Sequence, residues 1–250
     1  SLVPAGTPIR RPWGQASADG AGPPVFGPTA RLDYEVEAGF LVGGGSTLGE
    51  AVPVAHAERL LFGVCLLNDW SARDVQAWEY QPLGPFLAKS FATTLSPWVV
   101  TMDALAPFRV PAAARGAGDP APLPYLTDRA DAEGGGIAML VEVYLRSARM
   151  RTEGLPEVRL SRASLADMYW TPAQFIAHHT SNGCNLRPGD LLGSGTVSGP
   201  TKDARGCLLE LTWRGTEPLR LPSGEERRFL EDGDEVILRG SCEREGYVRI

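Results

Sequence analysis

Cysteine is scarce in this sequence, and its spacing excludes two kinds of small scaffold. The 250 residues contain four cysteines, which lie far apart, at positions 65, 184, 207 and 242. No two of them form a CxxC pair, so the sequence lacks both the zinc-knuckle pattern and the dense cysteine framework of small disulfide-linked domains. We therefore expect buried free thiols in a reducing cytoplasm.

Excess positive charge and long apolar runs are also missing. The sequence has 24 Lys and Arg against 30 Asp and Glu, a net charge of -6, whereas nucleic-acid-binding proteins usually carry clustered basic residues. The longest nearly apolar stretch, Leu60 to Leu67, is far shorter than the roughly 20 residues that span a bilayer. We expect neither a nucleic-acid partner nor a membrane segment.

Glycine and proline, by contrast, are abundant. The 29 glycines and 21 prolines exceed the roughly 12% of residues that these two types make up in average proteins. They indicate many turns, and with 43% hydrophobic and 22% charged residues they favour an ordered, β-rich chain. We expect one domain over residues 1–250, mainly β with flanking helices (α+β). The opening, which lacks Met, reads like the interior of a protein, so we also expect an upstream segment and domain.

One segment alternates with the period of a β-strand. From Arg31 to Val42, apolar and polar residues take turns, which predicts a strand with one face in the core. Its other face carries Asp33, Glu35 and Glu37. The strand therefore places three carboxylates on one face.

A fourth carboxylate follows the next expected strand. Residues 60–68 read as a buried strand that ends at Asp69. Together with Glu35 and Glu37, Asp69 offers the hard oxygen ligands that Ca²⁺ and Mg²⁺ prefer. Acids in an alternating strand are, however, more often simply its solvated face. On spacing alone, a cation site and a solvated face both stay open.

A helix is expected immediately after this strand. Ser71 followed by Asp74 resembles a capping box, which predicts a helix that starts at Ser71. Arg73, Gln76 and Tyr80 would then lie on one face of the helix.

The clearest helix signal lies further along the chain. Thr171 is a candidate N-cap, Pro172 suits the first helical position, Gln174 completes a capping box, and Asn182-Gly183 predicts the end. Among the other segments we expect strands at residues 93–102, 136–149, 191–195, 207–213 and 234–239, a helical turn at 55–59, and a surface loop at 111–136.

Two adjoining segments resemble a known signature. Residues 68–80 read Asn-Asp-Trp-Ser-Ala-Arg-Asp-Val-Gln-Ala-Trp-Glu-Tyr, and residues 82–98 read Pro-Leu-Gly-Pro-Phe-Leu-Ala-Lys-Ser-Phe-Ala-Thr-Thr-Leu-Ser-Pro-Trp. This stretch closely resembles the signature of the fumarylacetoacetate hydrolase family. Matching motifs extend to both ends of the chain: Gly6-Thr-Pro-Ile-Arg-Arg-Pro12, Leu32-Asp-Tyr-Glu-Val-Glu37, Met168-Tyr-Trp-Thr171, His178-His179, Asn182-Gly-Cys-Asn-Leu-Arg-Pro-Gly-Asp-Leu-Leu192, Ser194-Gly-Thr-Val-Ser-Gly199 and Asp232-Gly-Asp-Glu-Val236. The segment that ends at Tyr80 is similar to the longer family members rather than to the shorter bacterial isomerases and acylpyruvases.

The resemblance implies a fold and an activity. The fold would be a mixed β-sandwich roll, in a homodimer in the cytoplasm. The activity would be metal-dependent hydrolysis of a carbon–carbon bond in fumarylacetoacetate, a β-diketone, to fumarate and acetoacetate in tyrosine and phenylalanine catabolism.

The resemblance also implies roles for particular residues. Glu35, Glu37 and Asp69 would bind the catalytic Ca²⁺ or Mg²⁺, with a fourth carboxylate upstream of Ser1. The sequence does not distinguish these two cations, because both accept carboxylates.

Further implied roles concern the reaction and the substrate. The residues that would donate to a developing oxyanion are Arg73, Gln76 and Lys89. Glu210, within the expected strand 207–213, would orient a histidine general base that lies upstream of Ser1. The residues that would contact the substrate are Gln76, Tyr80 and Thr196.

The family also uses one loop for a second cation site, and the matching residues are Lys89, Ala92 and Thr93. Ala92 replaces the usual Gly, which leaves a backbone carbonyl available but makes a positive φ costly.

The three histidines do not supply the missing base. His178 and His179 stand in the last turn of the expected helix, where a cation favours the helix dipole, so a structural role is favoured. His56 is expected to be exposed. If no residues precede Ser1, we expect poor metal binding and little turnover.

Two rival hypotheses remain. One is a different reaction in the same superfamily, such as acylpyruvate hydrolysis or isomerisation of a dienoic diacid. The other is a non-catalytic cation-binding scaffold.

Overall fold

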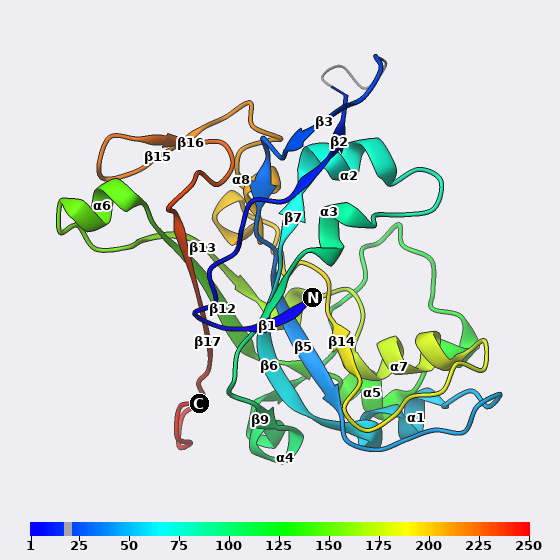
Figure 1. The fold of residues 1–250 in the computed structure, drawn as a ribbon. Coiled ribbons are helices and arrows are strands. Elements are labelled where there is room, and N and C mark those ends of the chain that lie inside the picture. The colour runs from blue at the N-terminus through cyan, green and yellow to red at the C-terminus, as the bar shows by residue number, and fades with distance from the viewer. Residues whose placement is uncertain (18–21) are drawn as a thin grey trace.

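The larger of two main sheets forms the centre of the fold (Figure 1). A computed structural model describes residues 1–17 and 22–250 of the chain. In this sheet the strand order is β1-β8-β6-β5-β14, and β9 also pairs with β6. The bounds are β1 Leu2–Pro4, β8 Thr93–Leu95, β6 Leu61–Asp69, β5 Val36–Val42, β14 Leu191–Gly193 and β9 Val100–Thr101. The long antiparallel pair β5–β6 forms its middle.

A second antiparallel sheet packs on the first. Its order is β13 (Val158–Ser164), β12 (Met139–Arg146) and β17 (Glu235–Cys242). Buried and half-buried residues alternate along β12, as expected for a strand with one face in the core. Val141 and Val143 of β12 share one hydrophobic cluster with Val36 and Phe40 of β5. The two sheets therefore enclose a common core.

Shorter elements surround these sheets. The two-stranded sheets are β2 (Trp13–Ala16) with β3 (Val25–Pro28), β4 (Leu32–Asp33) with β7 (Ser71–Ala72), β10 (Arg109–Val110) with β11 (Gly136–Ile137), and β15 (Leu219–Arg220) with β16 (Glu226–Arg227). The helices are α1 Val54–Ala57, α2 Arg73–Glu79, α3 Leu87–Ser90, α4 Met102–Leu105, α5 Arg129–Gly134, α6 Ala148–Thr152, α7 Pro172–Thr180 and α8 Leu208–Leu211. The 3₁₀ turns are η1 Glu58–Leu60, η2 Ala106–Phe108, η3 Pro124–Leu126, η4 Leu165–Asp167 and η5 Lys202–Ala204.

The expected α+β class is confirmed, with strands dominant and helices flanking the sheets. The strands expected at 60–68, 191–195 and 234–239 correspond to β6, β14 and β17, and the turn at 55–59 falls in α1 and η1. In α7 the Thr171 hydroxyl accepts from the Gln174 N–H, and the Gln174 side chain accepts from the Thr171 N–H. The capping box is therefore present as expected. Among the described residues, no helix is long and apolar enough to cross a membrane.

The expectation of one strand from Arg31 to Val42 is wrong. The strand is interrupted at Tyr34 and Glu35, so that β4 pairs with β7 while β5 pairs with β6. Alternation predicted the polar face, but Asp33 is fully buried. Its carboxylate accepts from the N–H of Tyr34, the next residue, and this local bond competes with a regular ladder.

The expected helix start at Ser71 is also wrong. Ser71 lies in β7, and α2 begins at Arg73 with Ala72 as its N-cap and no side-chain cap. Asp74 does not complete a capping box, because its carboxylate accepts instead from the Thr29 hydroxyl and from the N–H of Ala30.

The segment 207–213 is the largest error. It forms the helical turn α8, not a strand. Leu208 and Leu211 are its buried apolar residues, and their i, i+3 spacing is helical. The helix ends at Leu211, and Trp213, two residues further on, adopts a positive φ of 45°.

Smaller differences concern element bounds. Residues 111–136 contain η3 and α5 as well as loop. Residues 93–102 contain β8, β9 and the first residue of α4, and residues 136–149 contain β11, β12 and the start of α6. In α6, Ser147 is the N-cap and accepts from the N–H of Met150. Of the four free cysteines, Cys184 is exposed rather than buried.

Candidate active site

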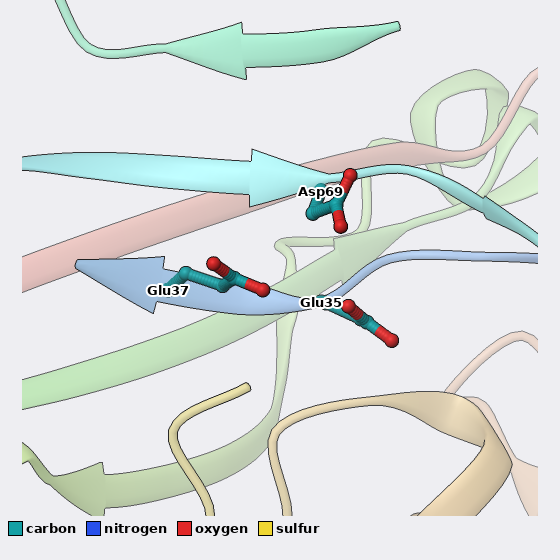
Figure 2. A group of neighbouring side chains, drawn as sticks. All are labelled: Glu35, Glu37 and Asp69. Carbon is teal, nitrogen blue, oxygen red and sulfur yellow. The ribbon is translucent and has the colours of Figure 1, made fainter. Parts of the chain in front are cut away.

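Three carboxylates meet where β5 begins and β6 ends (Figure 2). Glu37 lies in β5, Glu35 just before it, and Asp69 is the last residue of β6. One oxygen of each side chain lies within 4.8 Å of the others. The register explains the convergence, because the N–H of Asp69 donates to the carbonyl of Glu35 at 3.2 Å. The structure therefore brings together the three residues that we proposed as cation ligands.

The electrostatics of the cluster favour a cation. Burial, then the charges of Asp69 and Glu35, raise the pKa of Glu37 to about 8. Burial also raises the pKa of Asp69. Crowded, half-desolvated carboxylates repel one another, and a divalent ion relieves that repulsion. An all-oxygen donor set fits a hard cation such as Ca²⁺ or Mg²⁺.

Lys89, in α3, lies against this cluster. Its Nζ donates to Glu35 Oε2 at 2.6 Å and to Asp69 Oδ2 at 2.8 Å. Burial acts to raise the pKa of Glu35, but the charges of Arg73 and Lys89 outweigh it and the pKa is lowered. A protonated ammonium has no lone pair for a cation. Lys89 is therefore placed as a donor beside the cluster.

The rest of the implied second cation site stays a prediction. Ala92 is buried and Thr93 opens β8. In the part of the chain that the structure describes, Glu35, Glu37 and Asp69 form the one group of carboxylates, histidines and cysteines close enough to hold a metal ion.

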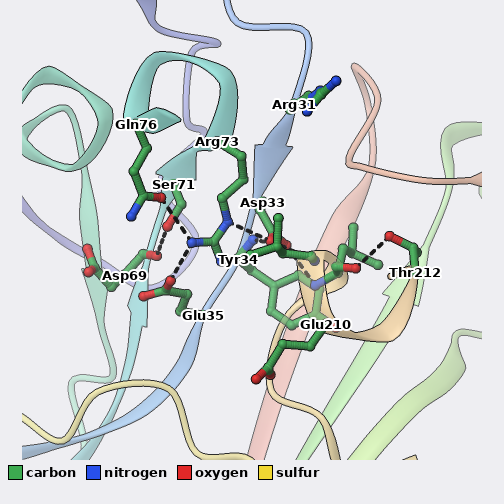
Figure 3. Close-up of polar contacts among 12 residues, drawn as sticks. Arg31, Asp33, Tyr34, Glu35, Asp69, Ser71, Arg73, Gln76, Glu210 and Thr212 are labelled. Atoms are coloured by element: carbon green, nitrogen blue, oxygen red, sulfur yellow. Dashed lines mark hydrogen bonds and ion pairs between the residues drawn. The ribbon is translucent and has the colours of Figure 1, made fainter. Parts of the chain in front are cut away.

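Arg73 joins the cluster to α2 (Figure 3). Its Nη1 donates to Glu35 Oε1 at 2.6 Å and to Gln76 Oε1 at 3.1 Å, and its Nε donates to Asp33 Oδ2 at 2.9 Å. Arg73 and Gln76 therefore share a helix face, as expected. Tyr80 caps the C-terminus of α2 and is exposed.

Glu210 is held by the loop that precedes α8. Its Oε2 accepts from the Ser198 hydroxyl at 2.6 Å and from the N–H of Gly206 at 3.2 Å. Its Oε1 has no hydrogen-bond partner among the described residues. Thr196 lies two residues before Ser198 and is half-buried. The carboxylate is thus fixed through one oxygen and can accept through the other.

The histidines lie elsewhere. His178 Nδ1 lies 2.9 Å from the Tyr125 hydroxyl, and His179 Nε2 lies 3.5 Å from Cys184 Sγ. His56 is exposed, as expected. Within residues 1–17 and 22–250, no hydrogen bond links any of the three to Glu210.

Sequence reasoning missed several residues that shape the site. Asp33 was assigned to the polar strand face, although it is buried against Arg73. No role was predicted for Ser198, which holds Glu210, although it stands in the matching motif Ser194-Gly-Thr-Val-Ser-Gly199. Gly193 was also overlooked, because glycine is needed there to leave space for Glu37, which lies in another strand.

Gly193 leaves room for Glu37, and its replacement gives a first prediction. A Cβ at this position would lie 2.7 Å from Glu37 Oε2, so Gly193→Ala displaces that carboxylate, which is a flexible side-chain end. We expect a folded protein whose affinity for Mg²⁺, measured by titration calorimetry, falls roughly 10- to 100-fold, the range found when groups that orient metal ligands are altered.

Gly27→Ala is the matched control, because a Cβ at Gly27 meets nothing within 4 Å. Equal Mg²⁺ affinity in Gly193→Ala and Gly27→Ala would remove Glu37 from the ligand set.

The fold is α+β and rich in strands, and its paired strands bring three carboxylates together beside an arginine and a lysine. This arrangement defines a class of protein with a carboxylate site suited to a divalent cation. Comparison with known sequences narrows this class. Residues 1–247 match the family described as fumarylacetoacetate (FAA) hydrolase C-terminal, and the chain belongs to this family.

Curated relatives and solved structures agree with this membership. The chain is 50% identical over 248 residues to fumarylacetoacetase of Homo sapiens, covering 99% of this chain and 57% of that protein. It is 50% identical over 247 residues to fumarylacetoacetase of Arabidopsis thaliana, covering 99% of this chain and 56% of that protein. The chain thus spans little more than half the length of these relatives. A putative HpcE protein from Mycobacterium smegmatis shares the fold with a TM-score of 0.52 and 21% identity, covering 93% of this chain and 70% of that one.

Proposed function

We propose that this chain is the catalytic domain of a fumarylacetoacetase, which hydrolyses 4-fumarylacetoacetate to fumarate and acetoacetate in tyrosine and phenylalanine catabolism. The observation that carries the proposal is the Glu35, Glu37 and Asp69 cluster with Lys89 and Arg73 in contact with it. The choice of substrate is supported by 50% identity to fumarylacetoacetases over 99% of the chain.

A divalent cation, Ca²⁺ or Mg²⁺, would be held by Glu35, Glu37 and Asp69, where it would polarise a ketone oxygen and stabilise developing negative charge. Water adds to the carbonyl carbon that becomes the fumarate carboxylate. The carbon–carbon bond then breaks, its electron pair leaves with acetoacetate, and a proton is taken up there.

The chain's own donors suit the developing charge. Lys89 Nζ and the Arg73 guanidinium carry positive charge at the edge of the cluster, and the Gln76 amide lies beside them. Such fixed donors are worth more in the transition state than in the ground state. Tyr80 and Thr196 are proposed to hydrogen-bond the carboxylate or ketone oxygens of the substrate.

Proton transfer from water needs a base near neutral pH. We assign that role to a histidine oriented by Glu210, whose Oε1 is available. Because the three histidines of this sequence lie elsewhere, we propose that the base and a fourth carboxylate ligand come from outside these 250 residues.

We also propose a second cation site at Lys89, Ala92 and Thr93, where a backbone carbonyl would be the donor. A homodimer is proposed because large apolar side chains are exposed, among them Trp98 at 81% and Leu83 at 79%. Sedimentation of the intact protein tests the dimer. A cytoplasmic location is proposed because all four cysteines are free.

The activity is tested by following the diketone absorbance of fumarylacetoacetate with the intact protein. We expect cleavage that stops on chelation and returns with Mg²⁺ or Ca²⁺. A folded, cation-loaded protein that cleaves acylpyruvates or isomerises a dienoic diacid instead would move the assignment to those reactions. No turnover of any of these substrates would indicate a cation-binding scaffold.

A further inference from the structure

Asp33 is surrounded by hydrogen-bond donors (Figure 3). Its Oδ1 accepts from the N–H of Leu208 at 2.8 Å and of Tyr34 at 2.9 Å. Its Oδ2 accepts from the N–H of Leu209 at 3.0 Å and from Arg73 Nε at 2.9 Å. The residue is 0% exposed. Each carboxylate oxygen therefore accepts two hydrogen bonds, and these bonds fix the side chain from several directions.

Only a carboxylate suits this position. Backbone N–H groups and a guanidinium cannot accept a proton, so a protonated carboxyl group or an amide would point a hydrogen at a donor. Asn at position 33 would leave two donors facing its own amide group.

Three of the four donors come from two elements of the proposed site: Arg73 from α2, and Leu208 and Leu209 from α8. Arg73 is the first residue of α2, and its Nη1 donates to Glu35 and Gln76. Leu208 is the first residue of α8, which carries Glu210. Cys207, the N-cap of α8, provides no side-chain cap, so Asp33 is the acceptor that fixes this turn. One buried carboxylate thus sets the position of α2 relative to α8.

A second buried pair shows what a purely structural ion pair looks like in this chain. Arg227 Nε donates to Asp234 Oδ2 at 2.8 Å and Nη2 to Oδ1 at 3.0 Å, with side chains 4% and 2% exposed. Within the described part of the chain, no hydrogen bond or ion pair joins either residue to a residue of the proposed site. Asp234 is therefore a matched control for Asp33: the same residue type, similar burial and the same partner type.

We propose that Asp33 is a positioning residue: the N–H groups of α8 fix its carboxylate, and the carboxylate holds the Arg73 guanidinium against Glu35. The inference rests on the proposed function and extends it to a residue that does not touch the substrate. A residue that acts through another loses its effect when that other residue is removed.

The experiment compares five forms of the intact protein: wild type, Asp33→Asn, Arg73→Met, the double variant and Asp234→Asn. We measure kcat and KM with fumarylacetoacetate, Mg²⁺ affinity by calorimetry, and stability in urea. Asp33→Asn is expected to lower kcat roughly 10- to 100-fold, as changes to residues that orient a site do. The double variant is expected to match Arg73→Met within about twofold, the usual limit of additivity error. Asp234→Asn is expected to lose stability and keep its kcat.

Two results would overturn the proposal: Asp33→Asn that loses stability alone, with kcat kept, or losses that multiply in the double variant. If Asp33→Asn does not fold, the double variant is compared with Arg73→Met by the same twofold criterion, because the double variant leaves no unpaired buried charge. If the wild type binds Mg²⁺ but cleaves nothing, the proposed function fails separately, and the same comparison is made on Mg²⁺ affinity. A double variant that loses as much Mg²⁺ affinity as Arg73→Met supports the positioning role of Asp33. A double variant in which the losses of the two single variants multiply refutes it.

Discussion

Glu37→Gln is expected to lose cation binding while the cation-free protein becomes more stable at neutral pH. Loss of one of three carboxylate ligands should weaken Mg²⁺ binding by more than about 100-fold, beyond the effect of altering an orienting group. Cleavage of fumarylacetoacetate should disappear with it. The gain in stability arises because the variant removes a carboxylate that burial, Asp69 and Glu35 disfavour.

The sign of the pH dependence follows from the raised pKa. In the unfolded chain a glutamate titrates near its model value of 4.5, and in the folded chain the pKa of Glu37 is about 8. Ionisation therefore costs folding free energy as the pH rises from 4.5 to about 8. Between these values, the wild type in chelator should lose stability relative to Glu37→Gln.

Urea unfolding in chelator at pH 5 and pH 8, with Mg²⁺ titrations alongside, measures both effects. Glu226→Gln, at a glutamate with a 54% exposed side chain in β16, is the control and should change neither quantity. A Glu37→Gln protein that binds Mg²⁺ like the wild type would refute the ligand assignment. One that is less stable than wild type at pH 8 would refute the repulsion argument.

The sequence predicted the elements whose signals are local. The capping box of α7 was predictable because Thr171 and Gln174 bond each other's backbone within one turn. The three cation ligands could be named because alternation and the end of a buried strand mark them. Their approach to 4.8 Å, however, depends on the β5–β6 register, which no short segment specifies.

The helix α8 could not be predicted, because its cause lies far away in the sequence. Asp33, which accepts from the N–H groups of Leu208 and Leu209, is 175 positions before Leu208. In the same way, the Thr29 hydroxyl donates to the carboxylate of Asp74, which is 45 positions later in the sequence, so this carboxylate does not cap the start of α2. Such tertiary hydrogen bonds override local helix and strand propensity. Asp33, which we had assigned to the polar face of a strand, joins two parts of the proposed site.

Lys89→Met should separate binding of the cation from catalysis. The Lys89 ammonium contacts Glu35 and Asp69, so its removal takes a positive charge away from the place where a cation would bind. Mg²⁺ affinity should be kept or increased. With the cation saturating, kcat for fumarylacetoacetate should fall on the order of 10²- to 10³-fold, the usual loss when one oxyanion donor is removed.

Steady-state kinetics and Mg²⁺ calorimetry on Lys89→Met, with Lys202→Met as the control, measure these two effects independently. Lys202 is 53% exposed and pairs with Glu217 away from the cluster, so its replacement should change neither kcat nor affinity. Should Lys89→Met lose Mg²⁺ affinity more than tenfold, Lys89 would be a residue that organises the carboxylates. If it keeps kcat at saturating Mg²⁺, the negative charge of the transition state is stabilised by other groups, and Arg73 with Gln76 becomes the pair to test.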